Sequence, residues 1–223
     1  MTALGLDGWR GRWAGALLDG RSVRLLVLEG TADALALPDV DAIGVDMPIG
    51  LSEDGVRACD VAARRELRGR GAASSVFPAP VRAVLAATDH AQATALSRAV
   101  SGRGVSVQTW GLVRSIRQLD DALGDPPDER VAEVHPELAF RELDDRVRDP
   151  KATARGLGQR LRALQPVMDV LDALAEAPAG LPVVDALDAC AAAWSAARVA
   201  AGTAREVGDG AVDARGRRMR ISW

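Results

Sequence analysis

Lysine, cysteine and aromatic residues are scarce in this chain, and these scarcities limit the classes of function that it can have. Lys151 is the single lysine among 28 basic residues, and there are five Trp, two Phe and no Tyr. A surface that stacks nucleic-acid bases on aromatic rings is therefore not evident. Cys59 and Cys190 are the only two cysteines and lack metal-ligand spacing, which indicates a reduced, cytoplasmic protein.

Long hydrophobic runs are also missing. The first ten residues, MTALGLDGWR, have no basic region followed by an apolar stretch, so we expect no signal peptide. No apolar run approaches the ~20 residues that cross a bilayer, so we expect no membrane partner. The net charge of −3 argues against a general duplex-coating protein. Any phosphates that bind must be neutralised by local arginine clusters or metal ions.

What remains is typical of one α/β domain. The chain has 223 residues, 48% of them hydrophobic, which suits a single domain over 1–223 with a helical insertion at about 51–125. Three strands with a tight Asp19-Gly20 turn predict an antiparallel meander, and an apolar fourth strand predicts a central, covered position. Strands are expected at 3–7, 13–18, 22–28, 41–46 and 130–134, with one short strand in the tail at 208–223.

Helical patterns fill the rest of the chain, apart from an irregular loop at 74–80. Helices are expected at 31–38, 53–70, 80–100, 110–123, 151–176 with a break at Pro166, and 183–201. The order of elements predicts an α/β fold with a five-stranded mixed sheet.

Acidic residues at the ends of these elements are the main functional signal. Asp7, Asp46 and Glu133 end or adjoin apolar strands, and Asp185 and Asp188 open the last long helix. Strand ends converge at one edge of an open sheet, and residues three apart share a helix face. Crowded carboxylates resist ionisation, and hard divalent cations relieve their repulsion. A solvated turn or a helix cap is the plainer explanation for any one acid, Asp185 in particular.

Several segments then resemble a known family in order along the chain. They are LGLDGWRGRWAGALL, GVDMPIGL, RACDVAARREL, SSVFPAP, VQTWGLVRSI, VAEVHPELAF, PKATARGLGQR and VVDALDACAAAW. Together they resemble the predicted RNase H-like nucleases, also called domain of unknown function 429. The resemblance runs from about residue 3 to the C-terminus.

The resemblance implies an RNase H-like three-layer fold, with helices on both faces of the sheet. It also implies a metal site for Mg²⁺ or Mn²⁺, as two ions, held by Asp7, Asp46, Asp185 and Asp188. The resemblance adds Glu133, which lies in the EVHPE motif, to the candidate site residues. Family members often carry Asp-Asp-x-x-Asp at the last helix, and Val184 replaces the first of these here.

A basic helix face and a serine pair are candidates for phosphate binding. Arg57, Asp60 and Arg64 have helical spacing and share a face, and with Ser74 and Ser75 they could bind a phosphate. The alternative is an ordinary helix surface with salt bridges.

Three further residues are candidates for the site. His135 could be a general acid, a metal ligand or a phosphate contact, or a buried histidine that donates to a carbonyl. Lys151 lies at a loop-to-helix start where an anion could bind, although a solvated helix start is the alternative. Gln108 could line the substrate pocket.

The favoured function is a metal-dependent phosphodiester hydrolase acting on a nucleic acid or nucleotide. In this hypothesis the catalytic group is Asp7, Asp46, Glu133, His135, Asp185 and Asp188, and the substrate-binding group is Arg57, Arg64, Ser75, Gln108 and Lys151. Alternatives are a nucleotide- or phosphate-binding protein of the actin and sugar-kinase-like superfamily, or a non-catalytic binding module. The oligomeric state is left open, with a homodimer as one option.

Overall fold

The first three strands form the antiparallel meander that the sequence predicts. In a computed structural model that describes residues 1–69 and 72–223, they are β1 (Thr2–Trp9), β2 (Arg12–Asp19) and β3 (Ser22–Leu28). Asp19 pairs with Ser22 across a two-residue turn, where Gly20 has the positive φ that such turns need. β1 continues two residues beyond Asp7, so this acid lies within the strand rather than at its end.

Two short parallel strands extend the meander into a five-stranded mixed sheet. They are β4 (Ala42–Val45) and β5 (Val131–Glu133). β4 pairs with β1 and β5 pairs with β4, which gives the order β3-β2-β1-β4-β5. All four residues of β4 are buried, as expected for a central strand covered on both faces. The five-stranded mixed sheet predicted from the sequence is therefore confirmed.

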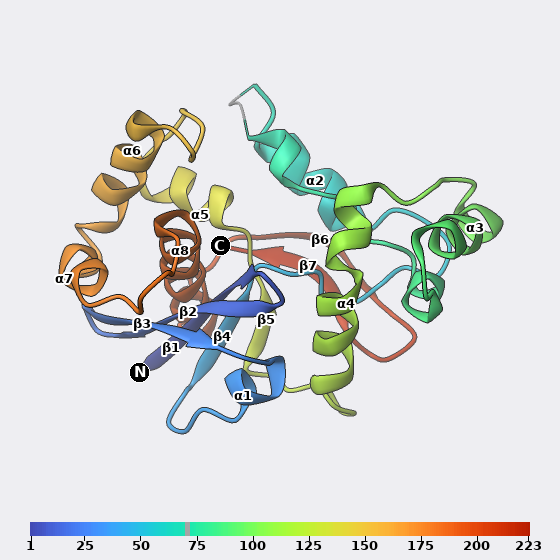
Figure 1. Cartoon of the computed structure of the whole chain (residues 1–223), viewed down its shortest axis with the longest axis horizontal. Coiled ribbons are helices and arrows are strands. Elements are labelled where there is room, and N and C mark those ends of the chain that lie inside the picture. Colours follow the sequence, from blue (N-terminus) through green and yellow to red (C-terminus); the bar gives the residue numbers. More distant parts are fainter. Residues whose placement is uncertain (70–71) are drawn as a thin grey trace.

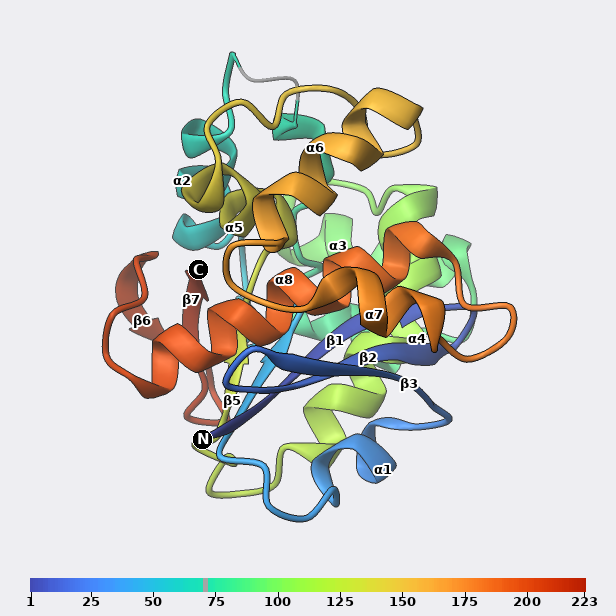
Figure 2. The same cartoon turned by 90° about the vertical axis from the view of Figure 1, so that its left-hand side faces the viewer.

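Helices cover both faces of the sheet, so the domain has three layers (Figure 1). The covering helices are α1 (Thr31–Leu35) and α4 (Val107–Ala122) on one face and α8 (Val183–Ala200) on the other. α8 runs across β1, β2 and β4 (Figure 2). Side chains alternate along a strand, so Leu4 and Leu6 pack toward α1 and α4, whereas Gly5 and Asp7 face α8.

The segment between β4 and β5 is helical, as predicted, but one of the expected helices is divided into two separate elements. It contains α2 (Ala58–Glu66), 3-10 turns at Ala73–Ser75 and Arg82–Ala86, α3 (His90–Ser101) and α4. The single helix predicted over 80–100 is wrong. The chain leaves its 3-10 turn at Ala86, and Asp89 begins a new helix by accepting a 2.8 Å hydrogen bond from the amide of Gln92. α2 and α3 lie beside the sheet, and α4 returns to cover it (Figure 1).

The segment after β5 adds three helices before α8 and a hairpin after it. These elements are α5 (Pro136–Leu143), α6 (Ala154–Leu164), α7 (Val170–Ala175), β6 (Glu206–Val212) and β7 (Arg218–Ser222). The sequence pattern does not predict α5. It predicts one strand in the tail, which is wrong, because two strands pair there. The break predicted at Pro166 is confirmed between α6 and α7. No helix in the described residues is long and apolar enough to cross a bilayer.

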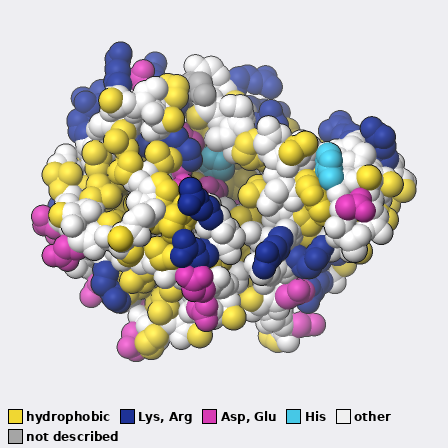
Figure 3. All heavy atoms as spheres, viewed as in Figure 1, with side chains coloured by type: hydrophobic (Ala, Val, Ile, Leu, Met, Phe, Trp, Pro, Cys, Tyr) yellow, Lys and Arg dark blue, Asp and Glu magenta, His cyan; other side chains and the backbone are white. Residues whose placement is uncertain are grey.

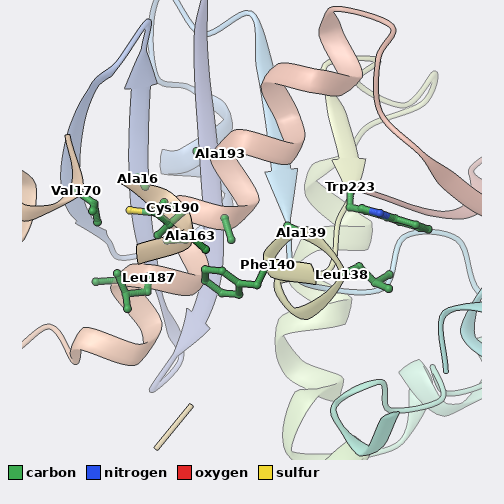
Figure 4. Close-up of a cluster of buried hydrophobic side chains, with 14 of the residues drawn as sticks. Ala16, Leu138, Ala139, Phe140, Ala163, Val170, Leu187, Cys190, Ala193 and Trp223 are labelled. Atoms are coloured by element: carbon green, nitrogen blue, oxygen red, sulfur yellow. The ribbon is translucent and has the colours of Figure 1, made fainter. Parts of the chain in front are cut away.

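The largest hydrophobic cluster lies between the sheet and α5 to α8. Figure 4 shows Phe140, Ala163, Val170, Leu187 and Cys190 pointing toward one another from four helices. Most of the buried residues that α8 contributes are alanines. Their small side chains let the α8 backbone approach the strands closely, which sets the position of the acids at its N-terminal end.

Ion pairs join the insertion to the C-terminal hairpin. Arg82 contacts Asp120 of α4 and Asp213 of the hairpin turn, and Arg217 donates to the Asp120 carbonyl. Asp213 also accepts a 3.1 Å hydrogen bond from the Leu51 amide. These contacts fix the helical insertion against the C-terminal hairpin.

Candidate functional site

One pocket gathers most of the residues that the sequence predicts as a site. Its volume is about 490 Å³. Figure 3 shows it as a hollow between two lobes, with basic side chains along its border and acidic side chains inside. The predicted site residues that line it are Asp7, Asp46, Arg57, Ser75, Glu133, His135, Lys151 and Asp188.

Two of the acids come from neighbouring parallel strands. Leu6 of β1 pairs with Val45 of β4, and Asp7 and Asp46 are the next residues along each chain. The amide of Asp46 donates a 2.9 Å hydrogen bond to the Leu6 carbonyl, which keeps the two chains together at this point. The acids therefore lie side by side because of the sheet register.

Asp188 joins them because α8 packs against the strands at two glycines. A Cβ atom on Gly5 would lie 2.0 Å from the carbonyl oxygen of Ala189, and one on Gly44 would lie 2.5 Å from that of Ala192. Only glycine fits at such close approach. Asp188 directly precedes Ala189, so this packing brings its carboxylate to the pocket, where it is 1% exposed.

The pKa of each of the three acids is raised, mainly because its carboxyl group is withdrawn from water. Burial raises the pKa of Asp7 well above its ordinary value, and the charges of Asp46 and Asp188 raise it further. Burial also raises the pKa of Asp46 to about 7 and of Asp188 to about 6, while Lys151 opposes both shifts. Asp185 is half-buried and outside the pocket lining; burial raises its pKa, and the charge of Lys151 and a hydrogen bond with Asp7 oppose the rise.

Lys151 provides a positive charge within this group. Its ammonium forms an ion pair with Asp188, and its charge also acts on Asp7 and Asp46. Burial by itself lowers the pKa of Lys151, but the attraction of these acids outweighs it and raises the pKa above its ordinary value. The amine is therefore charged in the neutral pH range.

The fit of this group to a divalent cation is partial. In residues 1–69 and 72–223, no three His, Cys, Asp or Glu side chains are arranged as a ready-made metal site. The donors nevertheless suit a hard cation, since they are carboxylates. Asp188 Oδ1 is buried and makes no hydrogen bond within the described structure. Mg²⁺ typically takes one or two carboxylates and completes its shell with water and substrate phosphate.

Glu133 and Arg57 form a buried ion pair beside the acids rather than among them. Arg57 donates to both Glu133 oxygens at 2.7 Å, to Asp60, and to the Ile49 and Gly50 carbonyls at 3.1 Å. Glu133 also accepts a 2.7 Å bond from the Ile49 amide. Burial raises the pKa of Glu133 and these bonds oppose the rise. Every guanidinium nitrogen of Arg57 is thus already engaged, which suits a structural link between α2 and β5 better than a phosphate contact.

His135 and Glu137 also line the pocket. Burial lowers the pKa of His135, so its ring is neutral in the neutral pH range. Its Nδ1 is buried and has no hydrogen-bond partner among the described residues. Glu137 Oε1 accepts bonds from Arg160, whereas Glu137 Oε2 is buried and unpartnered over 1–69 and 72–223. A neutral imidazole next to an acid can accept or pass on a proton.

The remaining predicted substrate contacts divide between the pocket and the outer surface. Ser75 lines the pocket, and its hydroxyl donates a 2.6 Å hydrogen bond to the Ala72 carbonyl. Arg64 and Gln108 are exposed and do not line the pocket. Burial raises the pKa of the Cys59 and Cys190 thiols to about 12, so neither is a ready nucleophile.

Several charged residues that line the pocket were not predicted from the sequence, among them Glu137, Arg148 and Arg160. Glu137 could have been found, because Pro136 at the first position of a helix and an acid in the first turn are a helix-start signal. Arg148 and Arg160 carry no such signal. They reach the pocket because α6 folds back onto α5.

Comparison with known protein families identifies a match over most of the chain. A family model described as "Protein of unknown function (DUF429)" matches residues 5–212. No curated protein and no solved structure matches the chain.

Proposed function

Because the chain belongs to the DUF429 family of proteins of unknown function, we propose its function from the pocket: metal-dependent hydrolysis of a phosphodiester bond. The observation that carries this proposal is the meeting of Asp7, Asp46 and Asp188 in one pocket, with the pKa of each raised. Folding these carboxylates together is unfavourable without a counter-charge. A site that retains them therefore suits a divalent cation.

Asp7, Asp46 and Asp188 would hold Mg²⁺ or Mn²⁺, with Asp185 at the edge of the group. An all-carboxylate donor set favours these hard ions over zinc. When bound, one or two such ions supply an activated water and stabilise the leaving oxygen. The substrate phosphate would complete the shell, in keeping with the lack of a ready-made three-residue group among the described residues.

The other pocket residues bind the substrate and move its protons. His135, whose Nδ1 faces no protein partner in the described chain, would take up or deliver a proton next to the phosphate. Arg148 and Lys151 lie on the α6 side of the pocket and carry the positive charge that a phosphate needs. Glu133 and Arg57 would keep the wall rigid from within.

The substrate class that fits best is a nucleotide or the end of a nucleic-acid strand. A pocket of about 490 Å³ has the size of a small-ligand site. The net charge of −3 disfavours binding of a long duplex by overall charge alone. The two cysteines are free and buried, and we assign the protein to a reducing, cytoplasmic setting on that basis.

The test is a cleavage assay with labelled single strands, duplexes, hybrids and branched DNA, with Mn²⁺ or Mg²⁺. Asp7→Asn is expected to lose at least about 100-fold in rate, because it removes one of the charges that would hold the cation. Asp33→Asn is the matched control, since this exposed acid lies on α1, on the other face of the sheet. Cleavage that persists in Asp7→Asn, or that needs no divalent cation, would overturn the proposal.

Nucleotide or phosphate binding without hydrolysis is the second candidate. The size of the pocket and the presence of Lys151 and Arg148 favour it as well. Calorimetry with ATP and with inorganic phosphate separates the two. Binding without cleavage of any strand would support this candidate. The absence of binding, cleavage and Mn²⁺ uptake would leave a non-catalytic module.

A further inference from the structure

Lys151 lies in a loop that several hydrogen bonds hold in place. The loop joins α5 to α6, and Gln159 holds it by accepting from the Arg148 and Asp149 amides at 3.0 Å. Arg160 donates to the Asp149 carbonyl at 3.0 Å. The backbone of Lys151 is therefore fixed, while its flexible side chain is 44% exposed and can move.

The ammonium of Lys151 occupies a place where a cation would bind. It contacts Asp188 Oδ2, and its charge also acts on Asp7 and Asp46. Asp188 Oδ1 is buried with no hydrogen-bond partner in the described chain, so half of this carboxylate is unused. One monovalent charge faces three acids, which leaves the group short of positive charge. A divalent cation would therefore compete with the ammonium for Asp188.

We propose that Lys151 is a tethered cation that occupies the acid group in the metal-free protein, and that it moves to the substrate phosphate when a divalent cation takes its place on Asp188. The inference rests on the proposed function and deepens it. Lys151 then has two partners in turn, Asp188 and the phosphate. Metal binding frees the ammonium for the phosphate, and phosphate binding draws the ammonium away from the metal position. The two ligands therefore strengthen each other's binding through one side chain.

The test is calorimetric titration of the full chain with Mn²⁺, with and without thymidine 5′-monophosphate. Lys151→Met removes the competing charge and is expected to bind Mn²⁺ about tenfold more tightly than the unmodified protein when no nucleotide is present. In the unmodified protein the nucleotide should tighten Mn²⁺ binding by about fivefold or more, and in Lys151→Met this effect should shrink by about threefold or more, to the part that direct contact between phosphate and cation supplies.

Two variants control the result. Arg155→Gln removes one positive charge four residues away; Arg155 is 80% exposed and pairs with Asp149 instead of the acid group. It should keep both the Mn²⁺ affinity and the nucleotide effect. Lys151→Arg keeps a cation in place and should bind Mn²⁺ within about threefold of the unmodified protein, since tethered charge is retained.

The outcomes separate the inference from the proposed function. Mn²⁺ binding that is equal or weaker in Lys151→Met, or a nucleotide effect that is as large there as in the unmodified protein, overturns the role of Lys151 and leaves the hydrolase proposal standing. No Mn²⁺ binding in either protein overturns both.

Discussion

Replacing Asp46 with asparagine should stabilise the metal-free protein, and the gain should grow as the pH rises. The folded protein holds the Asp46 carboxyl protonated up to a pKa of about 7, because this half-buried group has lost much of its contact with water, whereas the ordinary value is 3.8. Between these values the folded state binds more protons than the unfolded state. Its free energy of unfolding therefore falls as the pH increases through this window. Asparagine has a similar shape and no charge to bury.

The magnitude follows from the difference of about 3 pH units, which corresponds to ~4 kcal/mol at pH 8. The side chain is partly open to the pocket, so we take about half, ~2 kcal/mol. For a chain of this length that is a rise of about 4–8 °C in Tm. At pH 5, which is only slightly above the ordinary pKa of 3.8, the expected gain in the free energy of unfolding is under about 1 kcal/mol.

The assay is thermal unfolding at pH 5 and pH 8 with a chelator present. Asp33→Asn serves as the control and should leave Tm unchanged at both pH values, because Asp33 is exposed. Mn²⁺ should raise Tm of the unmodified protein at pH 8 and raise that of Asp46→Asn much less. A lower Tm for Asp46→Asn at pH 8, or an equal gain at both pH values, would refute the reasoning.

Three further predictions concern the packing of α8, the buried ion pair and the exposed surface of α2. Gly5→Ala should lower the free energy of unfolding, measured in urea, by ~2–3 kcal/mol and should weaken Mn²⁺ binding, because the added Cβ would push α8 and Asp188 away. Unchanged stability would contradict this account of the packing. Arg57→Met should lower the free energy of unfolding by ~3–5 kcal/mol, because it leaves Glu133 buried without its partner. Adding Glu133→Gln should restore part of that stability. If the double variant is no more stable than Arg57→Met, the ion pair is not the cause. Arg64→Ala should change stability by under about 0.5 kcal/mol and leave cleavage intact, and slower cleavage would extend the substrate site over α2.

Local sequence signals determined most of the sheet. The Asp19-Gly20 turn and the apolar run before Asp46 predict the meander and the buried central strand, because turn chemistry and hydrophobic pattern act over a few residues. The same approach failed over 80–100, where Asp89 caps a new helix, and over the tail, where β7 needs a partner strand to form. The hairpin strand β6 is mostly exposed and contains two glycines, so it lacks the apolar alternation that marks a strand in the sequence.

The candidate site divides in the same way. The sequence alone indicated that Asp7, Asp46 and Asp188 are acids at the ends of apolar elements, and those three lie together in the pocket. Only the tertiary structure decided that Glu133 is bound to Arg57, and that Lys151 lies on Asp188. Which carboxylate faces which cation depends on how helices pack on the sheet, and that packing is set by contacts between residues far apart in the chain.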